Sequence, residues 1–187
     1  MNLLQYIKGV VNLTSQEEQE IGTLFQQEEF SKGHFLFQQG DSCRHIFYME
    51  KGFARYYHNS YRGKEITAWF FAENTFVTAL DSFYQHKPTN YYCELLEDSI
   101  IYSIKYSDWE EMLNKSHAMA KFSFHTMYEV AKKMSEFMYS IKFQTAQERY
   151  KILLQDYPSI FQRVQLSYIA SYLGITPETL SRLRAEK

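Results

Sequence analysis

Two side chains near the end of the chain, Glu178 and Arg182, have chemistry suited to reading DNA bases. An arginine can donate two hydrogen bonds to a guanine, and a glutamate can accept one from a cytosine. Residues four positions apart share one face of an α-helix, so these two side chains would project together. The pair can act in this way only if it lies on a helix that enters a groove of DNA.

The surrounding residues predict such a helix. Gly174 ends a first helix, because glycine readily takes the left-handed conformation found at many helix exits. Thr176 can cap a second helix through its hydroxyl, and Pro177 suits the first helical position. The apolar edges along which the two helices pack consist of Ile169, Ala170, Leu173, Leu180 and Leu183. This spacing over residues 165–187 is typical of a DNA-binding helix-turn-helix, although an ordinary helical hairpin inside a core is the alternative.

The composition indicates a chain that does not need disulfide bonds or structural metal ions to be stable. With 187 residues it can bury a sizeable core. Cys43 and Cys93 suggest neither a disulfide framework nor a zinc site, and they fit a reducing cytosol. The N-terminus lacks a basic start and a small-residue cleavage site, and no run of about 18 apolar residues occurs. We therefore expect a cytoplasmic protein without a membrane span.

Charge is distributed unevenly along the chain. The net charge is −2, but from Lys142 onward seven basic residues accompany four acidic ones. A basic end on an acidic body is what a two-part DNA-binding sensor requires.

Residues 30–105 have the pattern of short strands separated by turns. Apolar and aromatic residues gather at 35–37, 46–49, 53–57, 66–71, 91–96 and 99–104, and glycines or Asp-containing turns separate several of these runs. The pattern predicts an antiparallel barrel or jelly roll. A helix is predicted before it over residues 13–28, with Ser15 and Glu18 as a capping box.

A long helix is predicted over about residues 116–142. Its apolar residues recur every three or four positions and form one stripe, and Met127, Ala131 and Met138 form a second stripe beside it. Two stripes suggest a helix buried on two sides, with a second copy of the chain against one of them. The alternative is a helix that packs entirely within its own chain. The residues expected at the dimer contact are Phe122, Val130, Met134, Phe137 and Ile141.

The whole pattern resembles the cyclic-AMP receptor/fumarate-nitrate regulator (CRP/FNR) family of bacterial transcription regulators. Besides the final motif, the segments that carry the resemblance are Lys32–Asp41, which reads KGHFLFQQGD, and Lys51–Tyr57, which reads KGFARYY. The resemblance covers almost the whole chain. It implies an α+β fold with a cyclic-nucleotide-binding-like β-roll over residues 1–115, a dimerisation helix over 116–143 and a helix-turn-helix domain over 144–187. It also implies a homodimer that binds near-palindromic double-stranded DNA.

In that family a glutamate and an arginine four residues apart in the second motif helix read the bases, and Glu178 and Arg182 match them. Several relatives carry an arginine where this chain has Pro177, so its sequence preference should differ. For Glu178 the alternative role is that of a helix-dipole partner. We also expect that the domain lacks a full two-stranded wing. The residues expected at the DNA are Thr176, Pro177, Glu178, Thr179, Ser181, Arg182, Arg184 and Lys187.

The sensor part departs from the cyclic-nucleotide-binding members of the family. Those members hold the ligand with a Phe-Gly-Glu stretch and a later Pro-Arg pair, whereas this chain has Phe76-Val77-Thr78 and Pro88-Thr89. Because these changes remove partners of the phosphate and ribose, control by cyclic AMP is not expected. The remaining pocket either holds a small, largely apolar effector or is filled by side chains. Its expected residues are Trp69, Phe71, Phe76, Thr78, Ser82, Thr89 and Tyr91.

The sequence lacks the residues that metal-based sensors and enzymes of known types require. An iron–sulfur sensor requires four thiolates, and the six histidines show no spacing typical of haem or metal ligands. The sequence has no His-x-His pair, P-loop or Ser/His/Asp signature. We therefore expect no cofactor, no bound metal and no enzymatic activity. The alternative function is a small-molecule-sensing β-roll whose C-terminal helices contact protein rather than DNA.

Overall fold

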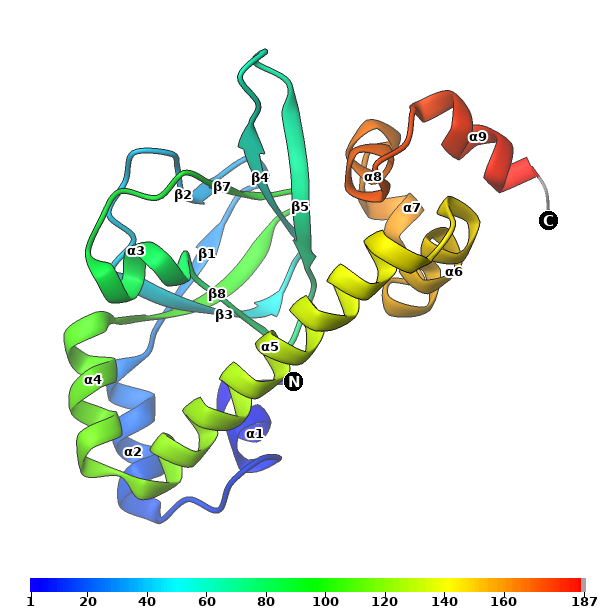
Figure 1. Ribbon diagram of the computed structural model, residues 1–187. Coiled ribbons are helices and arrows are strands. Elements are labelled where there is room, and N and C mark those ends of the chain that lie inside the picture. Colours follow the sequence, from blue (N-terminus) through cyan, green and yellow to red (C-terminus); the bar gives the residue numbers. More distant parts are fainter. Residues whose placement is uncertain (186–187) are drawn as a thin grey trace.

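Two four-stranded antiparallel sheets form a β-roll in the N-terminal part of the chain (Figure 1). The computed structural model describes residues 1–185. One sheet has the strand order β1-β8-β3-β6 and the other has the order β2-β7-β4-β5. The strands are β1 (Gln26–Phe30), β2 (Phe35–Phe37), β3 (His45–Lys51), β4 (Ala54–Asn59), β5 (Glu65–Phe71), β6 (Thr75–Val77), β7 (Tyr92–Leu95) and β8 (Ser99–Lys105). The predicted α+β fold with an antiparallel β-roll is therefore confirmed.

The interior of the β-roll lies between these two sheets. Met49, Ala54 and Leu95 are fully buried there, in a cluster to which both sheets contribute. Gly52 lies at the turn between β3 and β4 with φ of 124°, and a Cβ atom there would collide with the side chain of Ser99. This position therefore requires glycine for both its conformation and its lack of a side chain.

The helix predicted over residues 13–28 is shorter than expected. It is α2 (Ser15–Leu24), and its capping box consists of Thr14 and Glu17 rather than Ser15 and Glu18. Residues 26–30 instead form β1, which pairs along its whole length with β8. The local sequence pattern does not predict this strand. Its conformation is decided by backbone pairing with β8, some 70 residues away, from Gln26↔Ser103 to Phe30↔Ser99.

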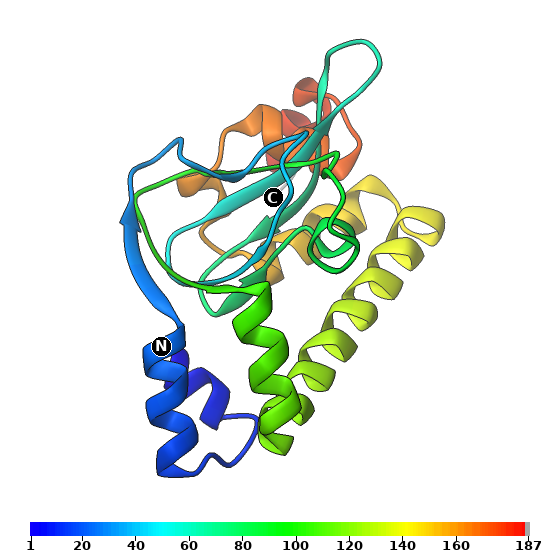
Figure 2. The same ribbon diagram turned by 90° about the vertical axis from the view of Figure 1, so that its left-hand side faces the viewer.

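Helices cover the outer face of the β1-β8-β3-β6 sheet. The cluster there joins α1 (Leu3–Lys8), α2, α4 (Tyr106–Lys115) and the beginning of α5 (His117–Phe143) to outward-facing residues of β3 and β8, such as Tyr48 and Ile104. A short helix, α3 (Leu80–Gln85), lies in the connection between β6 and β7. Figure 2 shows α1, α2 and α4 gathered at one end of the β-roll.

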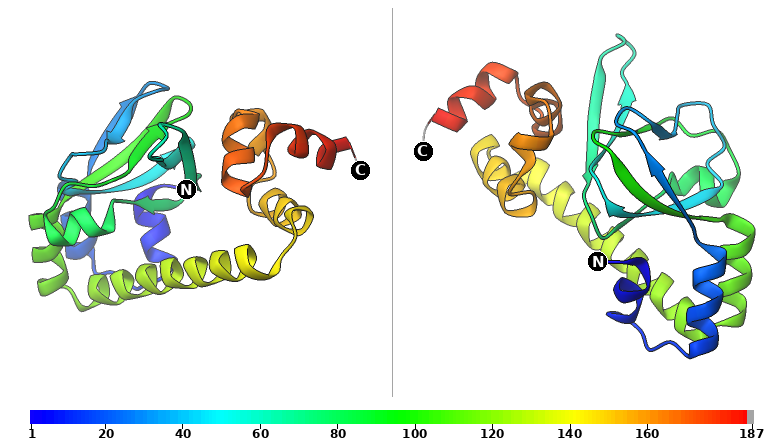
Figure 3. Two further views of the ribbon diagram at one scale, coloured as in Figure 1. Left: turned by 45° about the horizontal axis from the view of Figure 1, so that its top comes forward. Right: turned by 180° about the vertical axis from the view of Figure 1, so that it is seen from behind.

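The long helix α5 connects the β-roll to the C-terminal helices (Figure 3). Ser116 caps it, because its hydroxyl accepts a hydrogen bond of 3.0 Å from the Met119 backbone N–H. The C-terminal helices are α6 (Ala146–Asp156), α7 (Ile160–Arg163), α8 (Leu166–Leu173) and α9 (Pro177–Ala185). In the described part of the chain, no helix has the length and apolar character needed to cross a membrane.

Candidate nucleic-acid interface

The turn between α8 and α9 has the geometry that the sequence predicts. Gly174 lies in the left-handed region with φ of 67°, and the Ile175 backbone N–H donates to the Ala170 carbonyl at 3.0 Å. Thr176 then accepts a hydrogen bond of 3.3 Å from the Thr179 backbone N–H through its hydroxyl. These contacts satisfy backbone groups at the end of α8 and the start of α9, and they fix the angle between the two helices.

One face of α9 packs inward and the other is open. Leu180 is fully buried against α8 and Leu183 is half-buried, whereas Glu178, Ser181 and Arg182 are exposed. We call these three exposed residues the recognition face. The hydrogen bond from the Thr176 hydroxyl, assisted by the Glu178 backbone N–H and by Arg182, lowers the pKa of the Glu178 carboxyl. The carboxylate is therefore charged at neutral pH and remains accessible.

The other residues expected at the DNA surround this face. Thr176, Pro177 and Arg184 are exposed, and Thr179 is half-buried. The Thr179 hydroxyl accepts a hydrogen bond of 3.2 Å from Arg182, which orients the guanidinium along the helix. The Arg184 guanidinium lies over the ring of Phe161 at 4.6 Å. Lys187 lies outside the described residues.

Arg149 on α6 supports the motif in a way that the sequence analysis missed. Its guanidinium donates to the Leu173 carbonyl at 3.0 Å and to the Gln144 carbonyl at 2.7 Å. Leu173 is the last residue of α8, so the positive charge lies where the helix carbonyls are unpaired. In the sequence, Arg149 is one of the seven basic residues from Lys142 onward, and nothing distinguished it from a solvated charge.

Arg163 attaches the C-terminal helices to the β-roll. Its guanidinium forms ion pairs with Glu73 at 2.6 Å and Glu97 at 2.5 Å, and it donates to the Gly52 carbonyl at 2.9 Å. It also stacks on the ring of Phe53 at 4.6 Å. Hydrogen bonds to Glu97 raise the pKa of the Arg163 guanidinium, against the opposing effect of burial. The end of α7 is therefore tied to three separate turns of the β-roll.

A second arginine, Arg55 on β4, forms part of the same contact. It is only 1% exposed and pairs with Glu65 at 2.7 Å and Glu94 at 2.8 Å. Its guanidinium lies over the rings of Tyr57, at 3.8 Å, and of Tyr168 on α8, at 3.5 Å. A cation between two aromatic faces is held by the ring quadrupoles as well as by its ion pairs.

Direct hydrogen bonds also join the C-terminal helices to β5. The Thr67 backbone N–H donates to the Ser171 hydroxyl at 3.0 Å, and the Tyr157 hydroxyl donates to the Phe70 carbonyl at 2.8 Å. Figure 1 shows α8 beside the hairpin of β4 and β5. We call Arg163, Tyr157, Tyr168 and Ser171 the docking face. It positions the helix-turn-helix against the β-roll of the same chain while the recognition face stays open.

Comparison with known proteins agrees with this architecture. Residues 27–116 match the family model of the cyclic nucleotide-binding domain. FixK2 from Bradyrhizobium japonicum superposes with a TM-score of 0.74 at 16% identity, over 87% of this chain and 83% of FixK2. CLP from Xanthomonas campestris, a c-di-GMP-responsive global regulator, gives a TM-score of 0.71 at 13% identity, over 92% of this chain and 91% of CLP.

A protein from Eubacterium rectale, assigned to the transcriptional regulators of the CRP/FNR family, has a TM-score of 0.71 at 17% identity, over 91% of this chain and 82% of that protein. The chain therefore has the fold of the CRP/FNR regulators. This fold agrees with the resemblance drawn from the sequence. A search of curated protein sequences gave no significant match.

The residues predicted for a dimer contact on α5 divide between two environments. Met134 and Ile141 are exposed at 58% and 56%, whereas Val130 and Phe137 are half-buried. Phe137 packs against Trp69 of the β-roll and Tyr172 of α8. The prediction is wrong for Phe122, which is fully buried against Phe76 and Tyr6 of its own chain and cannot reach a second copy.

The exposed apolar residues of α5 form a different stripe. Those with large exposed side chains include Phe124, Met127, Met134, Met138 and Ile141. With Ala131, which is also exposed, they recur at alternating spacings of three and four residues. This is the spacing of a coiled-coil seam. The stripe noted second in the sequence, with Met127, Ala131 and Met138, is therefore the one that faces outward.

The residues predicted for an effector pocket do not all come together. Phe71, Phe76 and Thr78 line one cavity, which lies against α5. Ser82 and Thr89 are buried and engaged in hydrogen bonds with the backbone of Lys87 and Tyr91. The remaining two are held by aromatic contacts, Trp69 with Phe137 and Tyr91 with Tyr56.

Proposed function

We propose that this chain is a sequence-specific DNA-binding transcription regulator that acts as a homodimer. The observation that carries the proposal is the recognition face. Glu178, Ser181 and Arg182 are exposed on a helix whose opposite side is anchored by buried Leu180 and by the capped turn. A rigid helix with open hydrogen-bonding side chains near its start suits insertion into the major groove.

The exposed stripe on α5 supports a dimer. Pairing two copies along Met127, Met134 and Met138 would bury side chains that are otherwise 40%, 58% and 60% exposed. Burial of apolar area of this kind is the main driving force for association of helices. In a symmetric dimer the two copies of α9 would contact successive major grooves, roughly 34 Å apart, on a near-palindromic site.

DNA binding is tested by fluorescence anisotropy with labelled genomic fragments selected by the protein. We expect the apparent Kd of the wild type to rise steeply with salt, because binding releases counterions from the phosphates. Arg182→Ala should weaken binding to the selected site by roughly 5- to 150-fold, which corresponds to about 1–3 kcal/mol for one bidentate base contact. Lys64→Ala removes an exposed charge between β4 and β5 and serves as the matched control.

Binding that is absent, or that is insensitive to both salt and Arg182→Ala, would contradict this function. It would favour the alternative in which the C-terminal helices contact protein.

Dimerisation is tested by analytical ultracentrifugation of Met134→Glu. A carboxylate in the centre of the exposed stripe would have to be buried in the dimer, so we expect at least a tenfold weaker association. His125→Glu places a carboxylate at an exposed position on the far side of α5 from the stripe and should leave the association unchanged. A monomeric wild type, or equal effects of the two variants, would contradict the dimer.

Control by cyclic AMP is not part of the proposal. At the positions where cyclic-nucleotide-binding relatives have Gly and Glu, Val77 is buried in the core and the Thr78 hydroxyl donates to the His45 carbonyl at 2.8 Å. At the arginine position, Thr89 is 1% exposed. These side chains offer no positive charge to a phosphate. Calorimetric titration with cyclic AMP should show no binding, and saturable binding would overturn this point.

A further inference from the structure

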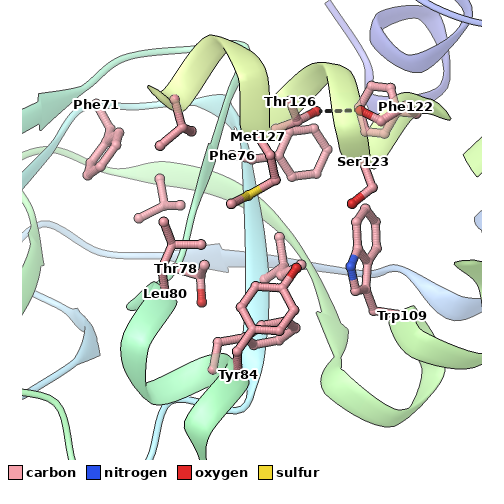
Figure 4. A pocket seen from close by; sticks show the side chains of 14 residues that line it. Phe71, Phe76, Thr78, Leu80, Tyr84, Trp109, Phe122, Ser123, Thr126 and Met127 are labelled. Atoms are coloured by element: carbon pink, nitrogen blue, oxygen red, sulfur yellow. Dashed lines mark hydrogen bonds between the residues drawn. The ribbon is translucent and has the colours of Figure 1, made fainter. Parts of the chain in front are cut away.

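A cavity of about 120 Å³ lies where the β-roll meets α3, α4 and α5 (Figure 4). Its wall is largely apolar, with Phe71 and Phe76 from the β-roll, Leu80 from α3 and Met127 from α5. None of the 14 residues that line it carries a formal charge. The cavity lies outside the core between the two sheets, where Tyr56 stacks on Tyr91 with ring centroids 4.5 Å apart.

One polar group in this wall has no partner. Trp109 on α4 is only 4% exposed, and its indole Nε1 makes no hydrogen bond within the described residues. Figure 4 shows the indole nitrogen turned toward the cavity, with the hydroxyls of Tyr84 and Ser123 directed toward the same region. A buried N–H without an acceptor is unfavourable and rare in folded proteins. Its direction points to an acceptor that enters the cavity.

We infer that this cavity is a binding site for a small, uncharged, mainly apolar molecule that carries one oxygen acceptor. The oxygen accepts a hydrogen bond from Trp109 Nε1, and the apolar part fills the space between Phe76, Leu80 and Met127. A dry engineered cavity of about 150 Å³ in another protein admits benzene, so this one suits a ligand of about one aromatic ring. A charged ligand is excluded because the wall offers it no counterion.

A ligand in this cavity would contact the long helix α5 directly. Phe122, Ser123, Thr126, Met127 and Val130 of α5 line one side of it, and α3 and α4 line others. An occupant would therefore brace α5 against the β-roll. The inference concerns the binding site alone and does not depend on DNA binding by α9.

Three fluorinated probes, each with one aromatic ring, test the chemistry of the site by ligand-observed ¹⁹F NMR with the full chain. We expect saturable binding of 4-fluorophenol, at least fivefold tighter than that of 4-fluorotoluene, and no binding of 4-fluorobenzoate at the same concentrations. A purely apolar cavity would give the reverse order for the first two, because toluene leaves water more readily than phenol. That reverse order, equal affinities, or no saturable binding of the phenol would overturn the inference.

Two substitutions locate the binding. Trp109→Phe removes the N–H donor and should abolish the preference for the phenol while binding of the toluene persists. Ser123→Leu fills part of the cavity and should weaken both probes at least tenfold, whereas Ser107→Leu, on the exposed side of α4, should change neither.

Circular dichroism and thermal unfolding check that each variant is folded. If Trp109→Phe does not fold, the contrast between Ser123→Leu and Ser107→Leu decides the location. Retention of the phenol preference in folded Trp109→Phe, or equal effects of the two leucine substitutions, would overturn the inference.

Discussion

The docking face and the recognition face of the C-terminal helices differ in how their polar groups are satisfied. On the docking face, Arg163 makes ion pairs with Glu73 and Glu97, and Ser171 accepts a hydrogen bond from β5. On the recognition face, Ser181 and Arg182 are exposed. Paired polar groups fix one domain against another, whereas exposed ones remain free to bind a partner. The comparison predicts that substitutions on the two faces separate stability from DNA affinity.

The largest effect on stability is expected at Leu180, and the adjacent Ser181, on the opposite side of α9, provides the control. Leu180 is fully buried, so Leu180→Ala should lower the free energy of unfolding by about 2–5 kcal/mol. Ser181→Ala should change it by less than about 0.5 kcal/mol, because the side chain is exposed. Urea denaturation measures both. Similar losses in the two variants would show that α9 is oriented differently.

A smaller loss is expected from the ion pairs of the docking face. Arg163→Met keeps the aliphatic stem but leaves Glu73 and Glu97 without their common partner, and the free energy of unfolding should fall by about 1–3 kcal/mol. Arg62→Met removes the same charge from an exposed site between β4 and β5 and is the matched control, with less than about 0.5 kcal/mol expected. Equal stabilities of these variants in urea denaturation would contradict the assigned docking role.

The smallest effect is the dependence of this contact on pH. Burial raises the pKa of the Glu73 carboxyl, but the hydrogen bonds and charge of Arg163 outweigh burial, so the pKa lies below its ordinary value of 4.5. The folded state then binds a proton less readily than the unfolded state, and Glu73 stabilises the fold above pH 4.5. This contribution is lost as the pH falls through the lower pKa of the folded state.

Glu73→Gln should therefore flatten the loss of unfolding free energy below pH 4.5, measured by urea denaturation at a series of pH values. Other carboxyls with lowered pKa, such as Glu17 and Glu148, keep part of the slope. Glu29→Gln, on the exposed side of β1, is the control and should leave the pH profile of the wild type unchanged. A profile in Glu73→Gln as steep as that of the wild type would exclude this ion pair as a source.

Local patterns predicted much of the fold. Each of the six apolar runs in residues 30–105 overlaps a strand, and the turn around Gly174 and Thr176 forms as expected. These features depend on alternation, glycine conformation and capping, which act within a few residues. By contrast, β1, β6 and α3 were missed. The residues of β1 are polar and become a strand because β8 supplies hydrogen-bond partners.

The candidate sites likewise differ in how much of them could be predicted from local patterns. The exposed side of α9 follows from helical spacing once Leu180 and Leu183 are assigned inward, so its residues could be named from the sequence. The stripes of α5 were visible too, but helical spacing identifies apolar faces without naming what covers them. Phe122 was therefore assigned to a second copy of the chain, although Phe76 and Tyr6 of its own chain cover it.

The sequence by itself determined the helix-turn-helix, its cap and its open face, because each depends on residues within one or two helical turns. Tertiary structure alone decided three further features. It brought Arg163 to Glu73 and Glu97, it enclosed Arg55 between Tyr57 and Tyr168, and it turned the Trp109 indole toward an uncharged cavity. Each of these depends on side chains tens of residues apart, and no local pattern records which of them will meet.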